Sequence, residues 1–340
     1  MSDFYTIGKM DISDLYSRIR AQHQRELDAR KREIFAKVPE LAELEKTQSE
    51  QNAGFLKRLI SLPQEEREEA KKVRRESSAR ITARMTELLT SAGYSADALQ
   101  MSYDCPICRD EGVVDGQRCS CYNKRMLTLL YQQSSMGDVL ERENFGAFSL
   151  DFYSRDQEPD GRPSPYHNME GILKKVKDYT KHAKEKPASF LFYGESGLGK
   201  TFLTHCIAKE LMEQGLSVLY LTANELFQQV LSPYLMSQDN ELKEALQPVF
   251  HLVYQADLLV LDDLGTELTN SFTLSQLFEV INRRSLDNRA TIISTNLSLE
   301  QLGERYQDRI LYRILERYEL CRIYGENIRI RIAAQKYNNR

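Results

Sequence analysis

The sequence predicts an α/β fold in the second half of the chain, with a parallel β-sheet covered by helices on both faces. Short apolar runs alternate with helical stretches from position 188 onward, as in sheets built from crossover units. The first hundred residues are dense in charge, and four of the six cysteines fall within positions 105–121. We therefore expect a charged helical region at 1–100, a cysteine module at 101–125, a connector at 126–185 and the α/β domain at 186–340.

Helices are expected throughout the first hundred residues. Apolar side chains recur there at roughly helical spacing with charge between them, at Ile12, Leu15, Ile19, Leu27, Ile34 and Phe35. Another helix is expected over 61–93, with acids early, bases later and Gly93 at its end. This pattern fits a solvated helical bundle and a partner-binding module equally well.

The overall charge excludes a globally basic nucleic-acid-binding protein. The 46 basic and 50 acidic side chains nearly balance, so any nucleic-acid surface has to be a local patch. No apolar run approaches the roughly 18 residues that span a bilayer, and the first residues lack the segments of a signal peptide. We therefore expect a cytoplasmic protein without membrane contact, whose cysteines stay reduced.

The cysteine stretch CPICRDEGVVDGQRCSC predicts a zinc site. Cys105 and Cys108 form a C-x-x-C pair, and Cys119 and Cys121 form a C-x-C pair after a ten-residue gap. Four thiolates at this spacing can close a tetrahedral Zn²⁺ site. A redox C-x-x-C would leave the second pair unexplained, and nothing else indicates the electron transfer of an iron–sulfur cluster. Because protein fills all four positions, we expect the zinc to be structural.

A phosphate-binding loop is predicted at residues 194–201, GESGLGKT. This G-x-x-x-x-G-K-[ST] pattern follows a strand-like run and precedes a helical stretch. Its glycines let backbone N–H groups point at a phosphate, and the helix N-terminus adds its positive end. Lys200 is expected to reach the β- and γ-phosphates of ATP, and Thr201 to hold Mg²⁺. The expected nucleotide-binding residues are Gly194, Glu195, Ser196, Gly197, Leu198, Gly199, Lys200, Thr201, Phe202 and, through Mg²⁺, Asp262.

Polar side chains end two of the later strand-like runs. Asp262 and Asp263 end the run DLLVLDD, where adjacent carboxylates are costly unless they serve a function. Asp262 is the expected Mg²⁺ partner, directly or through water, and Asp263 is the candidate base for the attacking water. Asn296 ends the run ATIISTN, at the sheet edge where ligands bind. Contact with the γ-phosphate and a capping role for the next helix both fit Asn296.

Four arginines recur every fourth residue in ERYQDRILYRILER, at Arg305, Arg309, Arg313 and Arg317. This spacing predicts one face of one helix. A solvated basic face that pairs with neighbouring acids fits the pattern. So does an arginine finger, which would stabilise transition-state charge in the ATP site of a neighbouring subunit.

Taken together, these motifs resemble the AAA+ ATPases of the bacterial helicase-loader type (DnaC/DnaI), to which the transposition helper IstB is closely related. The resemblance covers roughly residues 145–332 and rests on the order of FLFYGESGLGKT, LLVLDDLGTE, IISTNLSLEQL and RYQDRILYRI. The cysteines ahead of this region are more similar to the DnaI-like branch than to IstB.

The resemblance implies a five-stranded parallel sheet and a role for each motif residue. Asp262 and Asp263 would be the acidic pair, Asn296 the first sensor, and Arg313 or, less preferred, Arg309 the arginine finger. The segment 223–255 falls where such loaders carry a helical insertion that faces single-stranded DNA. Its aromatic side chains are more typical of helix packing, because the segment contains a single basic residue.

The sequence departs from many AAA+ proteins after the core. Few residues follow GENIRIR, so the helical lid is expected to be absent or vestigial, with Arg329 the one candidate for a second sensor. We therefore expect weak ATP hydrolysis by the isolated monomer, with self-association through the ATPase domain completing the site.

The resemblance implies an ATP-dependent loader of the DnaB-type replicative helicase, which controls helicase and single-stranded DNA engagement during replication initiation. An IstB-like helper of transposition or a phage replication protein would share the same ATPase. A zinc-dependent DNA-binding regulator with a degenerate ATPase is a third class, and the intact Lys200, Thr201, Asp262 and Asp263 argue against it.

Overall fold

The computed structural model describes residues 12–61, 63–133 and 136–338. By their internal contacts these residues form two compact units, one of residues Ile12–Arg118 and one that begins at Cys119. Each unit is considered by itself.

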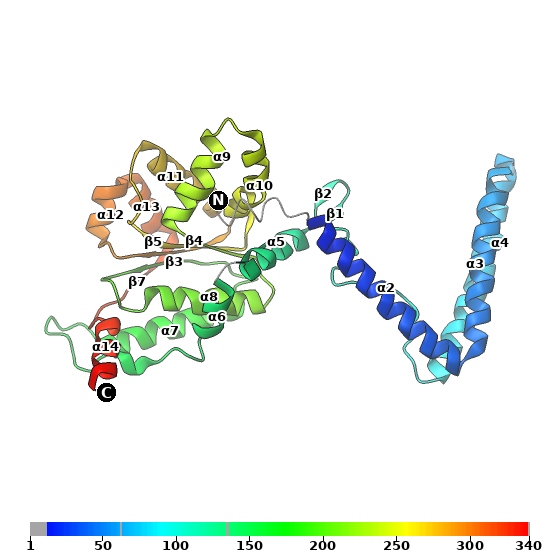
Figure 1. Ribbon diagram of the computed structural model, residues 1–340, viewed down its shortest axis with the longest axis horizontal. Helices are drawn as coiled ribbons and strands as arrows, with labels where there is room; N and C mark the ends of the chain where they lie inside the picture. Colours follow the sequence, from blue (N-terminus) through cyan, green and yellow to red (C-terminus); the bar gives the residue numbers. More distant parts are fainter. Residues whose placement is uncertain (1–11, 62, 134–135, 339–340) are drawn as a thin grey trace. The chain divides into compact units, whose positions relative to one another are not determined.

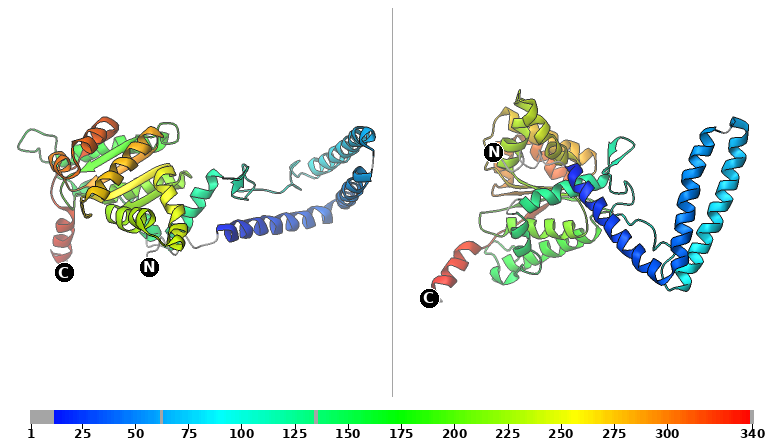
Figure 2. Two further views of the ribbon diagram at one scale, coloured as in Figure 1. Left: turned by 90° about the horizontal axis from the view of Figure 1, so that it is seen from above. Right: turned by 45° about the vertical axis from the view of Figure 1, so that its right-hand side comes forward.

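The first unit is built from three long helices and a small hairpin. The helices are α2 (Ile12–Lys37), α3 (Pro39–Ser61) and α4 (Gln64–Ser91), and the hairpin strands are β1 (Val113–Val114) and β2 (Gln117–Arg118). Helices α3 and α4 lie side by side (Figure 2). A small core of Ile34, Leu41, Leu89 and Ala98 joins the helices where they meet. Gly93, at φ 83°, ends α4 as predicted.

The second unit contains a five-stranded parallel sheet in the order β4-β5-β6-β3-β7. The strands are β3 (Ser189–Tyr193), β4 (Val218–Thr222), β5 (Leu258–Leu264), β6 (Ala290–Thr295) and β7 (Tyr318–Arg322). Because β6 lies between β5 and β3, the carboxyl ends of these three strands are adjacent. The topology therefore brings together the phosphate loop after β3, the acidic pair at the end of β5 and Asn296 after β6.

Helices cover both faces of this sheet. Figure 1 shows α7 and α8 on one face and α10 to α13 on the other. The helices of the unit are α5 (Ser120–Gln133), α6 (Met136–Arg142), η1 (Leu150–Phe152), α7 (Pro165–His182), α8 (Lys200–Glu213), η2 (Glu225–Leu231), α9 (Ser232–Met236), α10 (Asn240–Gln255), α11 (Ser271–Leu286), α12 (Leu299–Tyr306), α13 (Asp308–Arg317) and α14 (Ile328–Asn338). The predicted α/β fold is confirmed.

The arginine series does not lie on one helix, contrary to the prediction. Helix α12 ends at Tyr306 and α13 begins at Asp308, because Gln307 between them has φ 68° and cannot continue a right-handed helix. Arg305 therefore belongs to α12, where it donates to the carbonyl of Glu267 at 2.8 Å. The other three arginines share α13.

The segment after the sheet forms the short helix α14 in the described residues. Within those residues, no helix is long and apolar enough to cross a membrane.

Candidate nucleotide-binding site and cysteine cluster

The predicted phosphate loop joins the end of β3 to the start of α8. Gly194 has φ 144°, and a side chain there would collide with the carbonyl oxygen of Ile323. Gly199 has φ 88° and lies directly before the first residue of α8. Both positions require glycine, since L-residues rarely adopt such dihedral angles. The loop therefore opens at the N-terminus of α8, where a phosphate is favoured.

Three residues outside the motif hold the loop in place, and none of them was predicted from the sequence as a site residue. The Tyr153 hydroxyl donates to the Leu198 carbonyl at 3.0 Å. The Asn327 side chain donates to the Ser196 carbonyl at 3.1 Å. The N–H of Ile328, at the start of α14, donates to the Gly197 carbonyl at 2.9 Å. Asn327 and Ile328 lie in GENIRIR, which was quoted above only for the end of the core and for Arg329, and Tyr153 lies outside every motif quoted there.

Lys200 is buried and its ammonium group points into the loop. It donates to the carbonyls of Gly194 and Glu195 at 2.7 and 2.6 Å, and to Asn296 Oδ1 at 2.6 Å. Burial lowers the pKa of Lys200 to about 8, opposed by the charges of Asp263 and Asp262. Lys200 and Asn296 thus face the same point, where a γ-phosphate bound in the loop could contact both.

Asp262 is 3 % exposed and its carboxylate is held from several sides. Oδ2 accepts from the Tyr220 hydroxyl at 2.8 Å, and Oδ1 accepts from Ser294. The Thr201 hydroxyl lies 3.4 Å from Oδ1. Two ligands of one Mg²⁺ ion at about 2.1 Å would lie roughly 3 Å apart, so these two oxygens fit the predicted metal site.

Asp263 adopts an unusual backbone conformation at the end of β5. Its φ is 52°, and the pairing of β5 with β6 is irregular between Leu261 and Leu264. A bulge of this kind re-aims side chains. Burial raises the pKa of Asp263, helped by the charge of Asp262. A raised pKa makes a carboxylate a stronger proton acceptor, which suits the predicted base.

A cavity of about 1040 Å³ adjoins the loop. Glu195 and Asn296 line it from the nucleotide site, Arg322 lines it from the end of β7, and Glu326 lines it from the segment after β7. Of the other predicted loop residues, Leu198 is buried, the Phe202 ring contacts Phe148 edge-on at 5.8 Å between centroids, and Ser196 is exposed.

The two finger candidates contact α11. Arg313 donates to Asn282 at 2.8 Å, and the Arg309 guanidinium lies 4.9 Å from the Phe278 ring centroid. Their role in a neighbouring subunit stays a prediction. Burial lowers the pKa of Lys200 and raises that of Asp263, and the positive charge of Arg329 in α14 adds a small lowering contribution to both.

The insertion between β4 and β5 is helical, and its aromatic side chains pack internally. Phe227 is fully buried. The rings of Tyr234 and Phe250 stack at 4.0 Å between centroids. These contacts explain the aromatic residues without invoking DNA.

The four clustered cysteines meet the geometry of a metal site. The sulfur atoms of Cys105, Cys108, Cys119 and Cys121 all lie within 4.8 Å of one another. Sulfurs bound to one Zn²⁺ at about 2.3 Å are roughly 3.8 Å apart, so the donor set fits the predicted ion.

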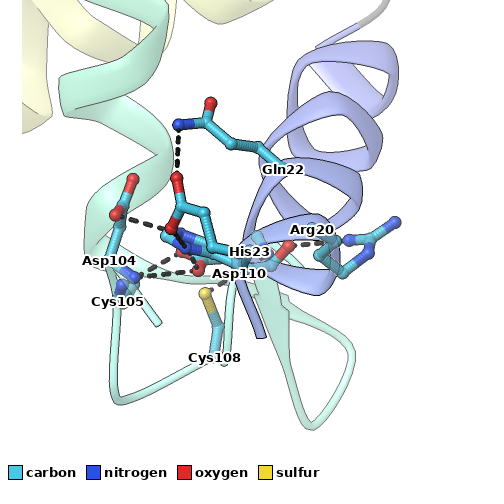
Figure 3. Close-up of polar contacts among 9 residues, drawn as sticks. Arg20, Gln22, His23, Asp104, Cys105, Cys108 and Asp110 are labelled. Carbon is cyan, nitrogen blue, oxygen red and sulfur yellow. Dashed lines mark hydrogen bonds and ion pairs between the residues drawn. The ribbon is translucent and has the colours of Figure 1, made fainter. Parts of the chain in front are cut away.

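Residues that sequence reasoning missed hold the first cysteine pair (Figure 3). The fully buried carboxylate of Asp110 accepts from the N–H groups of Asp104 and Cys105 at 2.9 and 3.0 Å. From α2, Arg20 donates to the Asp110 carbonyl at 2.6 Å, and His23 Nε2 lies 3.1 Å from Asp104 Oδ1. Such contacts around metal ligands orient them.

Fold and site together define a P-loop nucleotide-binding protein of the AAA+ class. Residues 174–336 match the family described as IstB-like ATP binding protein. The replicative helicase loader DnaC of Escherichia coli K12 is 30% identical over 142 residues, which cover 41% of this chain and 56% of that protein. This domain is thus similar to the IstB-like ATP-binding proteins and to the DnaC helicase loader.

Two further comparisons cover a larger share of this chain and of the matched protein. The phage-like element PBSX protein XkdC of Bacillus subtilis 168 is 26% identical over 253 residues, 70% of this chain and 86% of that protein. A crystal structure of the DnaC helicase loader has a TM-score of 0.42 at 23% identity, covering 55% of this chain and 99% of the other. The match to the E. coli loader spans only about half of that protein's length.

Proposed function

We propose that this protein is an ATP-dependent loader of a DnaB-type replicative helicase. The observation that carries the proposal is a full set of ATP-site side chains, in a domain similar to DnaC, on a chain that also has a four-cysteine cluster. The helical and cysteine region, residues 1–125, would bind the helicase. The ATPase domain would use ATP binding and hydrolysis to control engagement of helicase and single-stranded DNA in the cytoplasm.

The residues of the site support hydrolysis as well as binding. Lys200 would bind the β- and γ-phosphates in exchange for its present contacts with backbone carbonyls. A Mg²⁺ ion held by Thr201 and Asp262 would supply positive charge to the phosphates. Asp263 would accept the proton of the attacking water, and Asn296 would orient that water or the γ-phosphate.

Self-association would complete the site. Beyond β7, the described residues form the short helix α14. An arginine of α13 from a second copy, Arg313 or Arg309, would then stabilise the transition-state charge.

A phage-like replication protein is the second candidate. The similarity to XkdC covers 70% of this chain, which is more than the unit that begins at Cys119 contains. That similarity therefore begins ahead of Cys119, in the cysteine module or before it. An IstB-like helper of transposition would share the ATPase and bind a transposase instead.

The test uses the full-length chain with a purified DnaB-type helicase and circular single-stranded DNA. We expect ATP to increase the helicase recovered on the DNA. Lys200→Ala should weaken ATP binding about 10- to 100-fold, because it removes charge-assisted hydrogen bonds to phosphate, and should abolish the increase. Lys181→Ala, at an exposed lysine of α7, is the control. Helicase recovery that ATP does not change would reject the loader. The same assay with a transposase in place of the helicase, or with duplex DNA in place of the circle, tests the two alternatives.

A further inference from the structure

Tyr220, on strand β4, contacts a residue of the nucleotide site and lies one layer of side chains outside it. Its hydroxyl donates to Asp262 Oδ2 at 2.8 Å. The opposite carboxylate oxygen, Oδ1, is the one next to Thr201. Tyr220 therefore occupies the side of the carboxylate that faces away from the proposed metal position, which is where an orienting hydrogen bond has to be.

The Tyr220 side chain is itself fixed by α8, the helix that begins in the phosphate loop. The Thr204 hydroxyl lies 2.9 Å from the Tyr220 hydroxyl. The His205 ring packs on the Tyr220 ring at 4.8 Å between centroids, and Glu143 holds His205 Nδ1 at 2.6 Å. Tyr220 is only 5 % exposed, so water does not replace these contacts. The hydroxyl has one well-defined position.

The backbone of Tyr220 is fixed from the other side by α5. The Tyr131 hydroxyl donates to the Val218 carbonyl at 2.5 Å and accepts from the Tyr220 N–H at 3.0 Å. Both contacts lie on the outer edge of β4, because this strand pairs only with β5 in the sheet. Tyr131 therefore fixes the position of the β4 backbone relative to α5 at Tyr220, the residue that contacts Asp262.

We propose that Tyr220 is a positioning residue for the magnesium site. Its hydroxyl orients Asp262, and the hydrogen bonds of Tyr131 hold its backbone in place. This inference rests on the proposed function, since it concerns the Mg²⁺-dependent part of ATP binding. Tyr220 does not contact the nucleotide in this arrangement and acts only through Asp262.

The experiment measures binding of a fluorescent ATP analogue to the full-length protein across a Mg²⁺ titration and in EDTA. For Tyr220→Phe, which removes one oxygen, we expect the dissociation constant in EDTA to match that of the wild type within about twofold. The Mg²⁺ concentration that gives half of the metal-dependent gain in ATP-analogue affinity should rise about 10- to 100-fold, as for other residues that orient metal ligands. Tyr131→Phe should shift it in the same direction by less.

Tyr179→Phe is the matched control, because Tyr179 is a buried tyrosine of α7 that packs on Phe190. A Mg²⁺ dependence of Tyr220→Phe equal to that of this control overturns the inference and leaves the proposed function standing. Equal losses with and without Mg²⁺ also overturn it, because they indicate a general structural role. If Tyr220→Phe does not fold, Tyr131→Phe decides by the same criteria. Wild-type protein that binds no ATP rejects the proposed function and the inference together.

Discussion

The six cysteines occupy two chemically different settings. Four gather in the cluster, whereas Cys206 and Cys321 are buried singly in the ATPase unit. Burial raises the pKa of Cys206 to about 12 and that of Cys321 to about 11. Since the thiolate is the reactive form, a raised pKa lowers reactivity at any pH below it.

We expect this difference to appear on alkylation with iodoacetamide at pH 8. Cys206 and Cys321 should stay unmodified in the folded protein, since only about one thiol in 10³ or fewer is ionised. The four cluster cysteines should be protected in the zinc-loaded protein and modified after treatment with a chelator. Peptide mass spectrometry measures each site, and denatured protein gives the full signal. If treatment with the chelator does not change the labelling of the cluster cysteines, the result contradicts a metal site.

Single residues were predictable where a motif names them. Lys200, Asp262 and Asn296 follow from a loop pattern and from strand ends, and the structure brings their side chains together. Tyr220 and Asp110 carry no such pattern. Each acts through contacts to residues distant in the sequence, such as Asp262 and Arg20, so their positions depend on packing that periodicity does not describe.

Among the elements, the strands that alternate with helices were easier to predict than the last one. Four apolar runs predicted β3, β4, β5 and β6, because the side chains of these strands are buried on both faces of the sheet. Strand β7 has only two buried residues in YELCR, and only the resemblance implied it. The break at Gln307 was missed because a backbone dihedral angle leaves no trace in apolar spacing.

Helix α13 provides a test of the arginine finger. Arg313→Ala should lower ATP hydrolysis in concentrated protein by roughly 10³-fold, as for other fingers. Mixing it with Lys200→Ala should restore part of the activity, because the Lys200 variant still offers an intact Arg313 to its neighbour. Arg317→Ala on the same helix is the matched control.

Two results would speak against this role. One is a mixture that stays as inactive as its components. The other is wild-type protein that hydrolyses ATP as fast per site at high dilution as when concentrated.

At the scale of the whole molecule, the cysteine cluster and the nucleotide site are proposed to serve separate tasks. Cys108→Ser removes one of four metal ligands and also the sulfur that accepts the Gly112 N–H at 3.3 Å. We expect this variant to lose helicase capture at least 10-fold, because so small and polar a module depends on its metal to fold. ATP binding should change less than about twofold.

Calorimetry with ATP and a pull-down of the helicase measure the two effects on one preparation. Cys206→Ser, at a cysteine outside the cluster, serves as the control for helicase capture. Loss of ATP binding in Cys108→Ser would show that the cluster belongs to the ATPase domain and not to a separate module. Unchanged capture would show that the helicase binds elsewhere.

The contacts of Tyr131 also bear on solubility. An unprotected edge strand invites pairing with a strand of another molecule, which leads to aggregation. On β4, Tyr131 occupies the Val218 carbonyl and the Tyr220 N–H, and Glu225 accepts from the Thr222 N–H at 2.8 Å. A foreign strand would have to displace all three bonds. This edge of the sheet is therefore closed to extension by a strand of another molecule.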